Sequence, residues 1–335
     1  MRYLCSQTRN MAKETEMNSN LPHFTDSKSF SLDDLVARTH NFHESPYSME
    51  TLGHRKTLGL LFFNPSLRTR ISTQKAAQNL GLNVMVMNFN DEGWQLEYED
   101  GVIMDGGTSE HIKEAASVLG SYCDIVGVRS FAKLKDQESD SAETVLQGFI
   151  NHAGVPIVSL ESCLRHPLQS LADISLIKAY ETKSNPKIVL TWAPHVKPLP
   201  QAVANSFAEW CTTAGYEITI ANPEGYDLDP QFTQGHKITH NQNQALEGAD
   251  YVYAKNWSSL SPYGSVSSMF SDWTITKNKL ELTSEGKFMH CLPVRRNLVV
   301  SDEVLDSRQS LVQEQAKMRE YAAQAVLSKI LEQSL

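Results

Sequence analysis

The stretch Lys56–Asn64 (KTLGLLFFN), which runs directly into Pro65-Ser66-Leu67-Arg68-Thr69-Arg70, decides the fold of this chain. A continuous apolar run of this length that closes at a proline is typical of a buried parallel strand. Residues 69–80 then carry apolar side chains at helical spacing and stop at Gly81, which predicts a helix. A buried strand, a turn and a helix form the repeating unit of α/β proteins.

The same alternation extends in both directions from this stretch. On the N-terminal side, residues 29–42 are expected to form an amphipathic helix. On the C-terminal side we expect strands at 83–88, 124–128, 187–192, 217–221, 251–254 and 288–290, and helices at 109–119, 168–180, 201–214, 243–247 and 314–331. The pattern predicts an α/β protein of two doubly wound parallel-sheet domains, with the active site in a cleft between them.

The length of 335 residues suits two cores of ordinary size. Residues 22–175 are expected to form the first domain and residues 176–312 the second. Residues 313–335 are expected to form a helix that packs back on the first domain. Residues 1–21 are polar and are expected to be a disordered extension.

Composition and charge exclude several classes of protein. A formal net charge of -9 disfavours nucleic acid as a partner, so any anion site must be locally basic. No apolar run approaches the roughly 20 residues that cross a membrane, and the start of the chain lacks the apolar stretch of a signal peptide, so we expect a cytoplasmic protein. The five scattered cysteines resemble neither a disulfide framework nor a metal site, and we expect reduced thiols and no metal.

Residues 66–70 combine two hydroxyls and two guanidiniums at the expected start of a helix. The free N–H groups and the dipole of a helix N-terminus favour an anion, so this segment is a candidate phosphate site. A capped surface helix with solvated arginines is the alternative interpretation of the segment taken alone. The chain has neither GxGxxG after a strand nor GxxxxGK[ST], which disfavours a nicotinamide dehydrogenase and a nucleoside triphosphate enzyme.

Ser66-Leu67-Arg68-Thr69-Arg70 resembles the carbamoyl phosphate signature of the aspartate and ornithine carbamoyltransferases. Three more motifs follow in that family's order: Gly127-Val128-Arg129, His166-Pro167-Leu168-Gln169 and His290-Cys291-Leu292-Pro293. The resemblance spans residues 30 to 335, and the joint order of the motifs makes it specific. It implies transfer of a carbamoyl group from carbamoyl phosphate to an amine, with no metal or organic cofactor.

The resemblance also implies roles in binding the donor. Arg129 bridges the phosphate and the carbamoyl oxygen, Thr69 and His166 help to stabilise that oxygen, and Gln169 binds the carbamoyl amine together with the carbonyls of Cys291 and Leu292. We interpret Cys291 as a positioning residue, not a nucleophile. The full set of implied carbamoyl phosphate-binding residues is Ser66, Leu67, Arg68, Thr69, Trp94, Arg129, His166, Pro167, Leu168, Gln169, Cys291, Leu292 and Arg319.

The acceptor is indicated by the segment around Lys255. Ordinary ornithine carbamoyltransferases have an Asp there that binds a free α-ammonium, whereas Lys255 suits a carboxylate. This chain is similar to the N-acylornithine branch of the family. That resemblance implies Glu161, His195, Lys255, Leu292 and Arg295 as acylornithine-binding residues, Glu161 as a candidate proton acceptor, and a homotrimer in which Trp94 reaches a neighbouring subunit's site.

Ser109 is the expected determinant of the acyl group. Acetyl-specific enzymes have Glu at this position and succinyl-specific ones have Pro, and a Glu would repel the distal carboxylate of a succinyl group. Val299 stands where acetyl-type enzymes carry a carboxylated Lys. We therefore expect N-succinylornithine as the acceptor in arginine biosynthesis. The alternatives are N-acetylornithine, then ornithine itself, and a non-catalytic regulatory paralogue that binds phosphate-bearing ligands.

Overall fold

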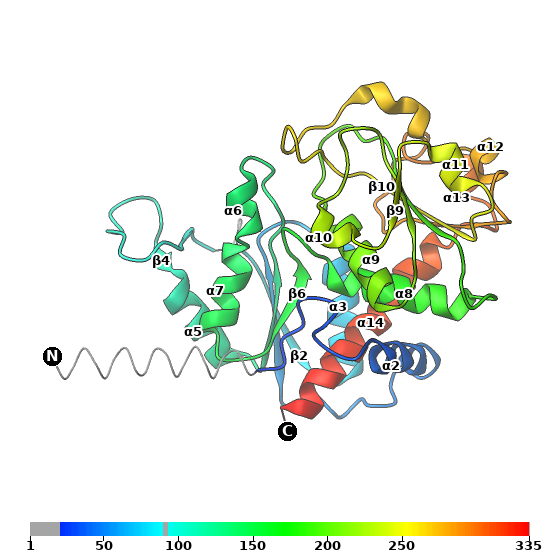
Figure 1. Ribbon diagram of the computed structural model, residues 1–335. Helices are drawn as coiled ribbons and strands as arrows, with labels where there is room; N and C mark the ends of the chain where they lie inside the picture. The colour runs from blue at the N-terminus through cyan, green and yellow to red at the C-terminus, as the bar shows by residue number, and fades with distance from the viewer. Residues whose placement is uncertain (1–20, 90–92, 335) are drawn as a thin grey trace, which may run out of the picture.

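The computed structural model describes residues 21–89 and 93–334, and its core is built on two large parallel sheets (Figure 1). The first sheet has the strand order β2-β1-β5-β6. Its strands are β1 (Thr57–Phe62), β2 (Asn83–Asn88), β5 (Ile125–Arg129) and β6 (Ile157–Glu161). The helices between and beside them are α3 (Arg68–Asn79), α5 (Ile112–Tyr122), α6 (Gln137–Ser141) and α7 (Thr144–His152).

The second sheet has the strand order β11-β10-β7-β8-β9, and its strands are also parallel. They are β7 (Ile188–Trp192), β8 (Thr219–Ala221), β9 (Lys237–Thr239), β10 (Tyr251–Lys255) and β11 (Lys287–Met289). The helical segments of this half are α9 (Ala202–Thr213), α10 (Pro230–Thr233), α11 (Gln242–Leu246), η1 (Ser268–Trp273), α12 (Lys277–Leu280) and α13 (Asp302–Leu305).

Each sheet has one point where the chain reverses its direction of travel across the strands. In the first sheet the chain moves from β1 to β2 and then returns to add β5 and β6 on the other side of β1. In the second sheet it moves from β7 through β8 to β9 and then adds β10 and β11 on the other side of β7. Ligands of doubly wound sheets bind beyond the carboxyl ends of the strands at such points. The fold therefore directs attention to the residues that follow β1, β5, β7 and β10.

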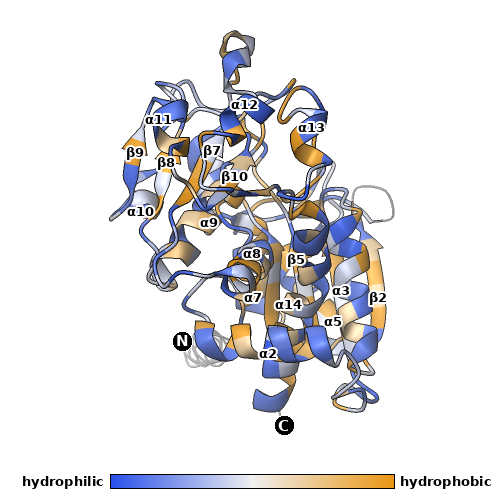
Figure 2. Cartoon of the chain, turned by 90° about the vertical axis from the view of Figure 1, so that its right-hand side faces the viewer, coloured by the Kyte–Doolittle hydropathy of each residue, from blue (hydrophilic) through white to orange (hydrophobic). Residues whose placement is uncertain are grey.

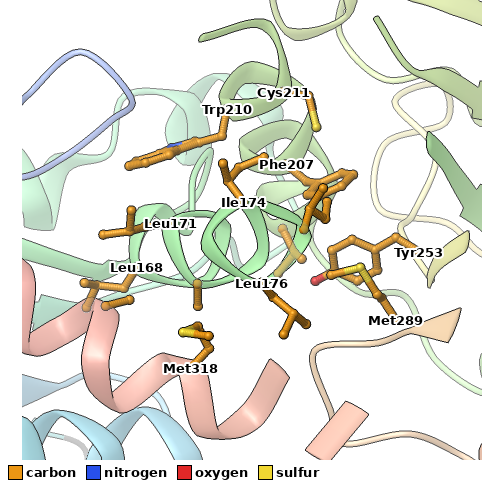
Figure 3. Close-up of a cluster of buried hydrophobic side chains, with 14 of the residues drawn as sticks. Leu168, Leu171, Ile174, Leu176, Phe207, Trp210, Cys211, Tyr253, Met289 and Met318 are labelled. Atoms are coloured by element: carbon orange, nitrogen blue, oxygen red, sulfur yellow. The ribbon is translucent and has the colours of Figure 1, made fainter. Parts of the chain in front are cut away.

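Helix α8 (Pro167–Tyr180) is buried on all sides, from Pro167 to Ile177. Burial all round a helix is typical of a central position. Figure 3 shows α8 between α9 and β10 on one side and α14 (Val312–Gln333) on the other. Its own Leu168 and Ile174 project into this space, where Phe207, Tyr253 and Met318 of the neighbouring elements belong to the same cluster. One hydrophobic cluster runs from the first sheet through α8 into the second sheet. The two halves thus share a continuous core.

The C-terminal helix α14 crosses back to the first half, where it packs against α2 (Leu32–Glu44), α3 and α8. Helix α2 begins after Ser31, whose side chain accepts from the backbone N–H of Asp34, and it buries Leu35 and Phe42. In Figure 2, hydrophilic and hydrophobic residues alternate along α2, whereas the β-strands are largely hydrophobic. This contrast is typical of helices that cover a buried sheet.

The predicted α/β class with two parallel sheets is confirmed. The prediction of a helix at 109–119 is wrong at its start, because Glu110–His111 (β4) pairs with Leu96–Glu97 (β3) and the helix begins only at Ile112. Strands β6 and β9 and helix α7 were not expected. Except for Leu21, the extension 1–21 lies outside the described residues. No helix among the described residues is long and apolar enough to cross a membrane.

Candidate active site

The loop after β1 leads into α3 at the reversal point of the first sheet. Leu67 is the N-cap residue of α3, and no side chain caps this helix start. The N–H groups of its first turn are therefore available to an anion. Leu67 is exposed, Ser66 and Arg68 are half-buried, and Thr69 is buried. The structure thus has the helix start that the sequence predicts as a phosphate site.

Arg129 ends the neighbouring strand β5 and reaches back to this loop. Its Nη1 donates to the carbonyl oxygens of Asn64 at 3.1 Å and Pro65 at 2.9 Å, and its Nη2 donates to Oε2 of Glu161 at 2.6 Å. Glu161 ends β6, and a register shift between Val128 and Arg129 places Arg129 opposite Glu161. These contacts hold a buried guanidinium beside the start of α3.

His166 lies on the other side of Glu161, where it precedes the first residue of α8, Pro167. Its Nε2 is 3.6 Å from Oε2 of Glu161, and its Nδ1 has no hydrogen-bond partner among the described residues. Burial, together with the charges of Arg319 and Arg129, holds the pKa of His166 well below its usual range. His166 is therefore neutral at physiological pH and can donate a hydrogen bond without carrying a charge.

Arg319 of α14 joins two of the predicted residues. Its Nη1 donates to Oε1 of Gln169 at 2.6 Å, and its Nη2 donates to the hydroxyl of Thr69 at 3.2 Å. All three side chains are buried. The sequence assigned them to one ligand from motifs that lie far apart in the chain, and the structure places them in direct contact.

The second sheet contributes a group of cations and imidazoles after β7, β10 and β11. Nε of Arg295 lies 3.3 Å from Nε2 of His195, whose Nδ1 donates to the carbonyl oxygen of Lys197 at 2.8 Å. Burial lowers the pKa of His195, and the charges of Lys255 and Arg295 lower it further. A neutral imidazole among ammonium and guanidinium groups suits the binding of carboxylates.

Residues of the two halves also influence one another. Burial lowers the pKa of Arg68, which interacts electrostatically with Cys291 and Arg129. Burial likewise lowers the pKa of His290, and the charges of Lys255 and Arg68 act in the same direction. The phosphate-loop arginine and the cations of the second sheet therefore lie near enough to act electrostatically on the same buried imidazole, His290.

The turn after β11 carries the predicted acceptors Cys291 and Leu292. The backbone N–H of His290 donates to Oε1 of Gln315 at 2.8 Å, and Nδ1 of His290 accepts from the N–H of Leu292 at 2.9 Å. Leu292 has a φ of 54°, a left-handed conformation that is costly for a residue other than glycine. Two hydrogen bonds on His290 thus stabilise the turn in this conformation. His290 follows β11 and is not part of a strand, contrary to the expected strand 288–290.

Trp94 and Ser109 are the predicted residues that the described protomer does not bring to this site. Both are exposed, and Nε1 of Trp94 donates to Oε2 of Glu110 at 2.8 Å. Figure 1 shows their neighbour β4 at the far side of the first sheet from the second sheet. The predicted link between them and the site therefore depends on another subunit.

Sequence reasoning missed Asn64, Asp173 and Gln315. Asn64 supports Arg129 through its carbonyl oxygen, and its side chain accepts from the N–H of Phe131 at 2.9 Å. Oδ1 of Asp173 accepts from Nε2 of Gln169 at 2.7 Å and from Nε2 of Gln315 at 2.8 Å. The signal for Asp173 was its position four residues after Gln169, one helical turn along α8.

The site has the chemistry of a transfer between two anionic reactants. One half holds three arginines and a bare helix start, and the other holds a lysine, an arginine and neutral imidazoles. Among the described residues, no group of three or more His, Cys, Asp and Glu side chains is placed to hold a metal ion. Four described cysteines, including Cys291, are free.

Two family models match the chain. The aspartate/ornithine carbamoyltransferase carbamoyl-P binding domain matches residues 20–179, and the Asp/Orn binding domain of the same family matches residues 200–330. The chain is 49% identical over 303 residues to the N-succinylornithine carbamoyltransferase of Bacteroides thetaiotaomicron, covering 90% of this chain and 95% of the relative. It is 34% identical over 338 residues to the N-acetylornithine carbamoyltransferase of Xanthomonas campestris pv. campestris, covering 94% of this chain and 99% of the relative.

Among solved structures, the chain is similar to a variant of N-acetyl-L-ornithine transcarbamylase in which one glutamate is replaced by serine. That structure is a complex with carbamyl phosphate and N-succinyl-L-norvaline. The TM-score is 0.87 and the sequence identity 33%, with 92% of this chain and 100% of that chain covered.

Proposed function

Because this chain belongs to the aspartate/ornithine carbamoyltransferase family, we propose that it transfers the carbamoyl group of carbamoyl phosphate to the side-chain amine of N-succinyl-L-ornithine. The products are N-succinyl-L-citrulline and phosphate, and the reaction serves arginine biosynthesis. The observation that carries this proposal is the presence of Lys255, His195 and Arg295 together at the acceptor side of the site. These groups favour an acceptor that carries carboxylates and no free α-ammonium.

The donor binds in this proposal at the start of α3. The N–H groups of the first turn, with Ser66, Arg68 and Thr69, hold the phosphate, and Arg129 reaches both the phosphate and the carbamoyl oxygen. Positive groups on the phosphate stabilise it as a leaving group, and hydrogen-bond donors on the carbamoyl oxygen stabilise the charge that develops there. Neutral His166 and Thr69 supply further donors to that oxygen.

The acceptor amine attacks the carbamoyl carbon, the bond from that carbon to the phosphate oxygen breaks, and the amine loses one proton. A free alkyl amine has a pKa of about 10, so the site must bind or generate its neutral form. Glu161 is the proposed proton acceptor, because it is a buried carboxylate held by Arg129 within the site. Holding both reactants in line supplies a further part of the acceleration.

The succinyl group is favoured over acetyl by the neutral side chain of Ser109. The N-succinylornithine carbamoyltransferase of Bacteroides thetaiotaomicron is 49% identical to this chain. The N-acetylornithine carbamoyltransferase of Xanthomonas campestris pv. campestris is 34% identical to it. The neighbouring solved structure adds a chemical parallel, because a glutamate-to-serine variant of an acetylornithine enzyme was crystallised with a succinylated ligand. Removing a negative charge at the acyl end is expected to admit a second carboxylate.

A homotrimer with shared active sites forms the second part of the proposal. Leu67 at the start of α3, Trp94 and Ile103 are 66%, 56% and 80% exposed. Met85, on the edge strand β2, is 57% exposed. Exposed apolar groups of this kind mark interaction surfaces. A partner that covers them also brings its Trp94 and Ser109 to this subunit's site. The proposed location is the cytoplasm.

The test of the reaction compares three acceptors at a fixed carbamoyl phosphate concentration: N-succinylornithine, N-acetylornithine and ornithine. The kcat/KM is expected to be highest for N-succinylornithine, lower for N-acetylornithine and lowest for ornithine. Faster turnover of N-acetylornithine would contradict the succinyl assignment, and binding of carbamoyl phosphate without any product would favour a regulatory paralogue. For the assembly, sedimentation equilibrium of the full chain is expected to give three times the monomer mass, and a monomer with full activity would contradict shared sites.

A further inference from the structure

Asp173 lies one turn beyond Gln169 on α8, beneath the residues proposed to bind the transferred group. Its side chain is fully buried between the two halves of the molecule. One oxygen, Oδ1, accepts from the amide nitrogens of both Gln169 and Gln315, at 2.7 Å and 2.8 Å. One carboxyl group therefore joins α8 to α14 directly below the site.

The orientation of each glutamine amide follows from these contacts. An amide has donors on its nitrogen and acceptors only on its oxygen. Since the nitrogen of Gln169 donates to Asp173, its oxygen faces Arg319, which can only donate, at 2.6 Å. Gln169 therefore turns a carbonyl oxygen toward the donor site, and its amide nitrogen is held below.

Gln315 is oriented by the same carboxyl oxygen. Because its nitrogen donates to Asp173, its oxygen accepts the backbone N–H of His290 at 2.8 Å. His290 in turn accepts the N–H of Leu292, in the turn whose carbonyls are proposed to face the carbamoyl amine. Asp173 thus supports two separate sets of carbonyl acceptors from one point.

We propose that Asp173 is a positioning residue that sets the choice of donor, by holding Gln169 and Gln315 so that hydrogen-bond acceptors face the amine end of the transferred group. Such a site binds a donor that carries an –NH2 group and disfavours an isosteric donor that carries –CH3. Carbamoyl phosphate and acetyl phosphate differ in this way. The inference rests on the proposed carbamoyl phosphate site and does not depend on which acylornithine is the acceptor.

The geometry also says which substitution should be tolerated. Oδ1 carries both hydrogen bonds from the glutamines, whereas Oδ2 accepts none from them, and the buried hydroxyl of Tyr253 also interacts with this carboxyl group. Burial raises the pKa of Asp173 to about 6, in keeping with the cost of a charge in this position. An asparagine can place its oxygen where Oδ1 lies and its amide nitrogen where Oδ2 lies. A leucine of the same shape has no acceptor and leaves two buried amide nitrogens unpaired.

The experiment compares the full-length protein with Asp173→Leu, Asp173→Asn and a control, Ser175→Ala. Ser175 is a buried residue of the same helix, and its hydroxyl has no hydrogen-bond partner among the described residues. Each protein is assayed for the KM of carbamoyl phosphate and for the inhibition constants of acetyl phosphate and inorganic phosphate. The ratio of the inhibition constant of acetyl phosphate to the KM of carbamoyl phosphate measures how well the site distinguishes –NH2 from –CH3. The inhibition constant of inorganic phosphate measures binding of the phosphate group alone.

Asp173→Leu is expected to lower this ratio at least about tenfold, because a tenfold change corresponds to the loss of one well-placed hydrogen bond. The inhibition constant of inorganic phosphate is expected to stay within about threefold of the wild-type value. Asp173→Asn and Ser175→Ala are expected to keep the ratio within about threefold. Asp173→Ser, a smaller polar side chain that falls short of both glutamines, replaces the leucine variant if that variant does not fold. The expected loss for Asp173→Ser is the same.

Two results overturn the positioning role. One is a leucine or serine variant that keeps the wild-type ratio, and the other is an asparagine variant that loses as much discrimination as leucine. Absence of product in the wild-type assay with carbamoyl phosphate and N-succinylornithine is a different failure, which removes the proposed function itself. Wild-type turnover together with an unchanged ratio in Asp173→Leu removes only the role of Asp173.

Discussion

Nη2 of Arg129 lies 2.6 Å from Oε2 of Glu161, with the two side chains only 10% and 11% exposed. The residues end adjacent parallel strands, so the sheet itself brings the cation and the carboxylate together. A pair this buried is balanced only while both partners are present, because removing one leaves an uncompensated charge away from water. The contact also links the proposed donor-binding arginine to the proposed proton acceptor.

Replacing that carboxylate by an amide, Glu161→Gln, is expected to lower kcat roughly 100-fold or more, the usual contribution of a general base. Steady-state kinetics with saturating substrates measures it. Glu209→Gln is the matched control, because Glu209 pairs with Arg165 at 2.9 Å in a similarly shielded salt bridge outside the site. Equal losses in both variants would mean that Glu161 acts through folding alone.

Arg68→Ala is expected to raise the KM of carbamoyl phosphate roughly 10- to 100-fold, since a hydrogen bond to a charged group contributes about 1.5–3 kcal/mol. The KM of the acylornithine should change much less. The exposed Arg308 provides the control variant Arg308→Ala, which removes the same charge from the surface. An unchanged donor KM in Arg68→Ala would contradict the phosphate site at the start of α3.

Ser109→Glu is expected to lower kcat/KM for N-succinylornithine at least about tenfold, because a new carboxylate would face the succinyl carboxylate across the proposed subunit contact. Turnover of N-acetylornithine should be affected less, so the ratio of the two specificity constants moves toward acetyl. Ser109→Ala removes the hydroxyl without adding charge and should keep the wild-type ratio. If the glutamate leaves the ratio unchanged, Ser109 does not contact the acyl group.

Asp173 should make stability depend on pH in a direction opposite to most carboxylates. Its folded pKa of about 6 lies above the ordinary value of 3.8 for an aspartate, so the folded protein binds this proton more tightly than the unfolded chain between those values. Stability therefore falls as pH rises from about 4 to 6, by about 3 kcal/mol for a shift of about two units. Chemical denaturation measures the free energy of unfolding of the wild type and of Asp173→Asn at several pH values between 4 and 6. The wild type should lose stability relative to Asp173→Asn as the pH rises through this range. A constant gap between them across that range would contradict the raised pKa.

The elements with long apolar runs were predictable from the sequence, because burial on both faces of a parallel strand leaves a continuous signal. Strand β6, which carries Glu161, was missed because Ser159 interrupts its short apolar run. The donor residues were predictable from ordered motifs, and the structure places Thr69, Gln169 and Arg319 in contact. Their proposed roles, like the four domain bounds, stay predictions.

Other parts of the site could not be found in this way. Asp173 accepts a hydrogen bond from Gln315, which lies 142 positions further along the chain. No local sequence pattern indicates a contact over that separation. Trp94 carries no signal of its own for the carbamoyl phosphate site, and Ser109 carries none for the acyl group, since a single protomer leaves both on its surface. Only the resemblance to a family of known assemblies suggested them.

The position of α14 has a consequence for how the protein is made. Arg319 is contributed by α14, yet it contacts Thr69 and Gln169, which are synthesised 250 and 150 residues earlier. A nascent chain that has emerged only through the second sheet lacks this guanidinium, and its phosphate-binding half cannot be complete. Competence to bind the donor should therefore appear only after α14 has been synthesised and has docked on the first half.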